Sequence, residues 1–163
     1  VISGGAGITA LSREGKDFMI SKYIPVNYKT LIHSKILSSL CINEIGAVIV
    51  AIVLILIKAK PLLFILGILC AIGSIALITF LGIYIDFKSP RLEWEDEKAI
   101  FKKNYMPLLM MIFIFILGSL LVAIAFIIKN YILVFIISMI ICIVPSLFFY
   151  KSLLKLANRI YNE

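Results

Sequence analysis

The chain has 163 residues, 63% of them hydrophobic, and carries a formal net charge of +7. Soluble domains are about half apolar, so this composition excludes an ordinary water-soluble domain and indicates a membrane protein. The basic residues are spread over several short polar intervals between long apolar segments, which argues against a nucleic-acid-binding surface.

The first eleven residues, VISGGAGITAL, are too short and too rich in glycine for the apolar core of a signal peptide. We expect them to be the end of an earlier membrane helix or the loop that follows it. The chain is then expected to be a C-terminal fragment of a longer protein, with residues 1–35 forming this helix end and a cytoplasmic segment.

Residues 12–35 read SREGKDFMISKYIPVNYKTLIHSK, the long polar stretch that precedes the first apolar segment. From Gly15 to Ile24 the polar and apolar residues alternate in the pattern of a short amphipathic helix. Pro25 should end this helix, and Asn27 can cap a second helix that continues into the membrane. The expected product is a short helix at the membrane surface, joined by a rigid elbow to a spanning helix.

Four apolar segments are each about as long as the ~20 residues that a helix needs to cross a bilayer. They are residues 36–57, 62–85, 107–128 and 131–150. Backbone groups exposed to lipid must be hydrogen-bonded within their own segment, so helices are expected, whereas barrel strands would alternate with a period of two. The sequence therefore predicts an all-α polytopic membrane protein. Its domains would be a transmembrane hairpin (36–85), a loop (86–106), a second hairpin (107–150) and a tail (151–163).

The basic residues are distributed unequally between alternate loops. Residues 12–35, 86–106 and 151–163 hold 13 of the 16 Lys and Arg residues, and the two short turns between the helices of each hairpin hold 3. By the positive-inside rule the three larger polar segments are cytoplasmic. We therefore expect a multi-pass protein of the cell membrane that contacts the lipid bilayer and no nucleic acid.

Two of these cytoplasmic segments carry helix signals of their own. In residues 86–106, Ser89 and Pro90 suit the start of a helix, and acidic residues precede lysines in the order that matches a helix dipole. The acidic cluster is a weaker candidate for cation binding, because it lacks a chelating loop with fixed glycine spacing. In residues 151–163, apolar and basic residues alternate as in an amphipathic interfacial helix.

Few residues inside the spans are candidates for chemistry. Asn43 and Glu44 lie within the first span, where they form a candidate polar path. Glu44 either lines that path, bonds a neighbouring helix, or lies near enough to the cytoplasmic boundary to be hydrated. Asn43 is expected to join two helices, and His33 lies at the boundary.

No span contains a second carboxylate, a histidine or a lysine to pair with Glu44, so we expect no catalytic site and no enzymatic activity in this chain. The three cysteines are widely spaced within apolar segments and are expected to be small packing residues. We expect neither a metal nor a cofactor. No G-x-x-x-x-G-K-[ST] motif is present, so any use of ATP would need a separate subunit.

Two segments resemble a known family. Residues 12–35, and residues 82–104 with the sequence GIYIDFKSPRLEWEDEKAIFKKN, are similar to cytoplasmic segments of ABC-2-type transporter permeases, in particular multi-span ABC exporter permeases of low-GC Gram-positive bacteria. The resemblance implies an exporter permease that is powered by a separate ABC ATPase. Residues that would couple the two subunits are Glu14, Gly15, Lys16, Phe18 and Pro25.

Members of this family are longer, with more spans upstream, so further permease helices or a second copy of the chain would complete a transport pathway. The alternative is a polytopic membrane protein that transports nothing and has an assembly, immunity or scaffold role.

Overall fold

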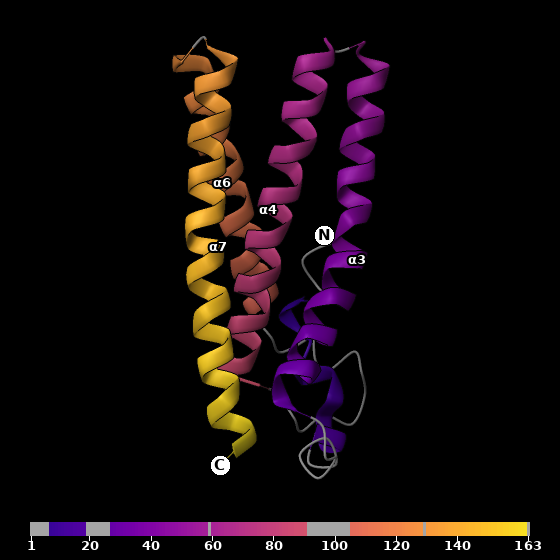
Figure 1. Cartoon of the computed structure of the whole chain (residues 1–163), viewed down its shortest axis with the longest axis vertical. Coiled ribbons are helices and arrows are strands. Elements are labelled where there is room, and N and C mark those ends of the chain that lie inside the picture. Colours follow the sequence, from indigo (N-terminus) through magenta and orange to yellow (C-terminus); the bar gives the residue numbers. More distant parts are fainter. Residues whose placement is uncertain (1–6, 19–26, 59, 91–104, 129, 163) are drawn as a thin grey trace.

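The computed structural model describes residues 7–18, 27–58, 60–90, 105–128 and 130–162 (Figure 1). Its elements are the 3-10 helix η1 (Ser12–Asp17) and the α-helices α3 (Tyr28–Leu56), α4 (Pro61–Lys88), α6 (Met106–Ile127) and α7 (Tyr131–Asn162). The four α-helices are each long and apolar enough to cross a membrane. The all-α fold with four spans is confirmed, and the chain is a multi-pass membrane protein.

The helices form two hairpins whose short outer turns lie at one end of the bundle (Figure 1). The charged ends of α3, α4 and α7 lie at the opposite end, which the positive-inside rule assigns to the cytoplasm. Helix α4 packs against both α3 and α7, whereas α6 packs only lightly against its neighbours. The main contact between the hairpins is therefore the α4–α7 interface, while the outer ends of the hairpins lie apart (Figure 1).

Helix α3 begins where the sequence predicts, because the side chain of Asn27 accepts a hydrogen bond from the Lys29 backbone N–H at 3.0 Å. The helix then continues into the membrane without a break. Helix α4 begins with Pro61 in its first turn, where a missing N–H is tolerated. Lys58, in the turn between α3 and α4, has a φ of 50°.

The hydrophobic core lies at the cytoplasmic end of the bundle, where buried side chains of α3, α4 and α7 meet two from residues 11–18. The cluster contains Leu11, Phe18, Ile32, Ile36, Ile83, Phe87, Leu153 and Ala157. Toward the outer turns most large apolar side chains are exposed, Phe126 by 80% for example. Lipid is as apolar as these side chains, so this part of the bundle needs no buried core.

Two helices continue past the C-terminal ends of their apolar segments. Helix α4 continues through Asp86 and Phe87, which are 3% and 1% exposed, to Lys88. Helix α7 continues past Tyr150 to Asn162, and Leu153 and Ala157 are fully buried within it. The tail is thus helical as expected, but it is an unbroken extension of the last span, and part of its apolar face packs against protein.

The polar intervals are only partly described. Residues 12–17 form a 3-10 helix that begins three residues before the predicted amphipathic helix, with Gly15 at a φ of 51°, a conformation that favours glycine. The remainder of that predicted helix and the elbow at Pro25 lie outside the described residues. Ser89 ends α4, and the helix predicted after it falls in residues 91–104, also outside the described residues.

Candidate functional site

Residues 7–18, called the N-terminal segment below, pack directly on the backbone of α4. A Cβ atom on Gly82 would lie 3.3 Å from the backbone nitrogen of Ile8 and 3.4 Å from the carbonyl carbon of Gly7. A Cβ on Gly7 would in turn lie 3.3 Å from the carbonyl oxygen of Thr79. Glycine at both positions allows this close approach, as small residues do between membrane helices.

The carboxyl group of Asp86 holds the N-terminal segment on α4. Its Oδ2 accepts hydrogen bonds from the backbone N–H groups of Leu11, at 2.5 Å, and Ser12, at 3.0 Å, and its Oδ1 accepts one from the Ser12 hydroxyl. All of these groups are buried. Buried polar groups require partners, so this one side chain satisfies the first residues of η1 and fixes their position on α4.

A second contact joins the segment to α3. The Nζ of Lys35 donates hydrogen bonds to Oε1 of Glu14 and, at 3.1 Å, to the carbonyl oxygen of Ala10. The side chains of Lys35 and Glu14 are 11% and 28% exposed, so the pair is largely shielded from water. Removal of one partner would leave the other charge poorly solvated, which is the costly way to break such a pair.

A third contact joins the segment to α7. The ring of Phe18, which is 5% exposed, meets the ring of Tyr161 edge to face, with 5.7 Å between their centroids. Such aromatic pairs stabilise a fold beyond the area that they bury. The N-terminal segment is thus bound to α4 by hydrogen bonds, to α3 by an ion pair and to α7 by aromatic packing.

Two of the five predicted coupling residues, Glu14 and Phe18, lie within these contacts. Glu14 faces Lys35, Gly15 is buried at the turn of η1, and Phe18 faces α7. The side chain of Lys16 and all of Pro25 lie outside the described part of the structure. Their role in coupling stays a prediction.

Sequence reasoning missed two residues of this site. Arg13 is the exposed residue among those of the N-terminal segment whose side chains are described. Asp86 is its main anchor, and in the sequence it is a charged residue at the end of the second apolar segment. Its hydrogen-bond partners lie 74 and 75 positions away, too far along the chain for a local pattern to reveal.

The candidate polar path begins with a buried contact between α3 and α4. Asn43, 2% exposed, donates from Nδ2 to the hydroxyl of Thr79 at 2.7 Å, which confirms that it joins two helices. Its Oδ1 is buried and has no hydrogen-bond partner in the described part of the chain. Glu44 beside it is half-buried, and a role for the two residues in a polar path stays a prediction.

Two of the cysteines lie in the interface between α4 and α7. The Sγ of Cys70 is 3.1 Å from the Ser138 hydroxyl, and Cys142, 1% exposed, has its Sγ 3.5 Å from the Ser74 hydroxyl. These contacts fit the expected role of small packing residues. At the boundary, the Nε2 of His33 lies 2.9 Å from the Tyr150 hydroxyl, which links α3 to α7.

The groups at the cytoplasmic end are arranged for attachment. Asp86 is occupied by three donors and Glu14 by Lys35, so both carboxyl groups serve to hold the N-terminal segment in place.

No family model matches the chain, nor does any curated protein or solved structure. Any function must therefore be argued from the chain's own residues and their arrangement.

Proposed function

We propose that this chain is the membrane-spanning permease part of an ABC exporter of the ABC-2 type, powered by a separate ATPase. The resemblance of residues 12–35 and 82–104 to such permeases supports the proposal. The observation that carries it is the attachment of the N-terminal segment to α3, α4 and α7 at the cytoplasmic end. A partner that moves this segment therefore acts on three spans at once.

In this proposal the ATPase pushes on the N-terminal segment and the contacts transmit the movement. Asp86 passes it to α4 through hydrogen bonds to two backbone N–H groups, which leave the segment little freedom to slide. Lys35 passes it to α3, and Tyr161 passes it to α7. Packed, hydrogen-bonded contacts of this kind move as units between discrete arrangements, which suits a switch between two states of a transporter.

The ATPase would meet the N-terminal segment at Arg13. Because Glu14 and Phe18 face the bundle, Arg13 is the charged side chain that the described part of the segment presents outward. Guanidinium groups bind carboxylates in a planar, bidentate geometry, so an acidic residue of the ATPase is the expected contact. Asn43 and Glu44 would line the route of the substrate, completed by upstream helices or by a second copy.

The test is purification of the tagged full chain from its own host in mild detergent, with mass spectrometry of the proteins that co-purify. We expect an ATPase that carries a P-loop motif, and ATP hydrolysis by the purified complex. Arg13→Glu should reduce the amount of bound ATPase by at least about tenfold, the effect of roughly 1.4 kcal/mol. The matched control is Lys151→Glu, the same charge reversal at an exposed residue of α7.

A second variant separates binding from coupling. Lys35→Met detaches the N-terminal segment from α3 and leaves Arg13 in place, so the ATPase should still bind while its hydrolysis rate in the complex changes. If no P-loop ATPase co-purifies, or if Arg13→Glu and Lys151→Glu bind it equally, the coupling proposal fails. The first of these results favours the polytopic protein without transport activity.

A further inference from the structure

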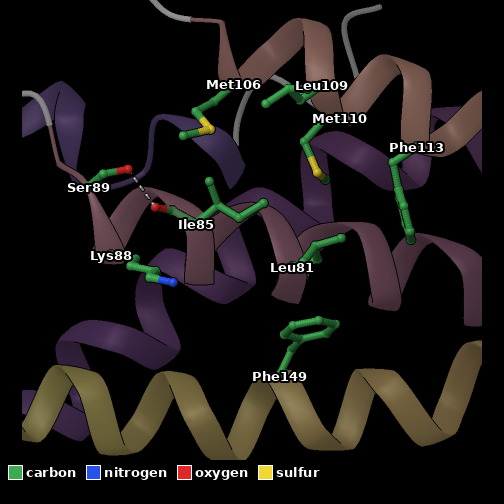
Figure 2. Close-up of a pocket in the computed structure, with 9 residues that line it drawn as sticks. All are labelled: Leu81, Ile85, Lys88, Ser89, Met106, Leu109, Met110, Phe113 and Phe149. Carbon is green, nitrogen blue, oxygen red and sulfur yellow. Dashed lines mark hydrogen bonds between the residues drawn. The ribbon is translucent and has the colours of Figure 1, made fainter.

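An apolar pocket of about 640 Å³ lies between α4 and α6 near the cytoplasmic end (Figure 2). Leu81 and Ile85 of α4 and Met110 and Phe113 of α6 line its length, and Phe149 of α7 closes one side. This volume falls within the range of roughly 300–1,000 Å³ that small-molecule sites have in proteins. The pocket is separate from the contacts that hold the N-terminal segment.

The polar groups of the pocket are confined to one end. Of its nine lining residues seven are apolar, and the two others, Lys88 and Ser89, are neighbours where α4 ends. Figure 2 shows them at the end of the pocket opposite Phe113. Lys88 is exposed and makes no ion pair with any residue that the structure describes. The pocket thus has one cationic end at the membrane boundary and an apolar remainder that extends toward the membrane interior.

The pocket is accessible from the lipid because α6 is loosely packed. Met110 is the buried residue among those of α6 whose side chains are described, while Leu109, which also lines the pocket, is 55% exposed. A molecule in the bilayer can therefore enter between the helices from the side. The thioethers of Met106 and Met110 add flexible walls that adapt to chains of different shape.

We propose that this pocket binds an anionic phospholipid of the cytoplasmic leaflet. Its phosphate pairs with Lys88, and one acyl chain runs past Ile85 and Leu81 toward Phe113. The charge decides the lipid class, because a zwitterionic lipid fills the apolar part equally well but gains less from the lysine. Basic pockets between spans on the cytoplasmic side bind anionic head groups in this manner.

The test uses tryptophan fluorescence of the full chain in phospholipid vesicles. Trp94, the single tryptophan, is replaced by Phe, and Phe113→Trp introduces a reporter within the pocket. In otherwise identical vesicles either phosphatidylglycerol or phosphatidylcholine carries brominated acyl chains, which quench a nearby tryptophan. We expect the apparent affinity at the reporter to be about fivefold higher for phosphatidylglycerol, the contribution of one lysine near an anionic surface.

Matched variants separate the pocket from the general lipid environment. Lys88→Gln should bring the ratio of the apparent affinities for the two lipids close to one. Lys151→Gln, the same change at an exposed lysine that does not line the pocket, should leave this ratio unchanged. A reporter at Phe115, which is 72% exposed and outside the pocket, should show no preference.

Three results would overturn the proposal. One is an equal effect of the two lipids at the Phe113 position, and another is a preference that survives Lys88→Gln or appears equally at Phe115. The third is an absence of quenching by either lipid at the Phe113 position, which would mean that something else, such as the chain's own residues, fills the pocket.

Discussion

Replacement of Asp86 by alanine should release the N-terminal segment from α4. The substitution removes the acceptor of two buried backbone N–H groups, those of Leu11 and Ser12, and of the Ser12 hydroxyl. The hydroxyl can rotate to another partner, but the two N–H groups are fixed by the backbone. Each buried donor left without an acceptor costs about 1–3 kcal/mol, so the two together cost about 2–6 kcal/mol.

The lost free energy lowers the stability of the N-terminal segment against local opening and does not unfold the bundle. The four helices keep their own hydrogen bonds, and the α4–α7 interface extends far along both helices from Asp86, as far as Cys70 and Ser138. The free energy for release of the N-terminal segment should therefore fall while that of the spans stays the same. Asp86→Asn should have a smaller effect, because its amide oxygen still accepts from the backbone and its amide nitrogen donates to the Ser12 hydroxyl.

Amide hydrogen exchange at single-residue resolution, in detergent micelles, measures this opening directly. Since about 1.4 kcal/mol corresponds to tenfold, exchange at Leu11 and Ser12 should accelerate at least about 30-fold in Asp86→Ala, and less in Asp86→Asn. The amide of Leu77, in the middle of α4, serves as the internal control. Unchanged protection at Leu11 and Ser12, or an equal loss at Leu77, would refute the view that Asp86 holds the segment.

Two further predictions test packing. Gly82→Ala places a methyl group against the Ile8 backbone and should destabilise the fold by about 1–3 kcal/mol. The control Gly118→Ala, on α6, meets nothing within 4 Å and should stabilise its helix by up to about 1 kcal/mol. Thermal unfolding in detergent measures both variants, and equal effects would contradict the close approach at Gly82. Ser138→Cys should form a disulfide with Cys70, whose Sγ lies 3.1 Å from the Ser138 hydroxyl. On oxidation of this variant, the number of thiols that react with maleimide should fall by two. If both cysteines still react, the register of α4 against α7 is contradicted.

The existence and the order of the spans follow from local sequence. A run of about 20 apolar residues predicts a membrane helix whatever surrounds it, and the bias of lysine and arginine between loops predicts the topology. Asn27 likewise marks the start of α3 by a contact two residues away. The predicted second span stops short of the end of α4, because contacts distant in sequence decide where this helix ends. Helix α4 continues to Lys88, since Asp86 and Phe87 are buried against the N-terminal segment.

The candidate site was predictable only in outline. The sequence interpretation named Glu14 and Phe18 as candidate residues, but it could not say which residues their side chains contact. The structure shows these contacts: Glu14 pairs with Lys35, Phe18 with Tyr161, and Asp86 with the start of η1. Arg13, the exposed residue, was indistinguishable in the sequence from its charged neighbours.

The sequence by itself determined that this chain has four apolar segments long enough to cross a membrane, and its charge bias assigns the larger polar segments to the cytoplasm, because hydropathy and charge act locally and do not depend on the fold. Only the tertiary structure decided which helix faces pack together. Helices that are apolar on every side carry no pattern to distinguish a lipid-facing from a protein-facing stripe. Hence the central place of α4, the light packing of α6 and the burial of the N-terminal segment among three helices emerged only from contacts between residues far apart in the chain.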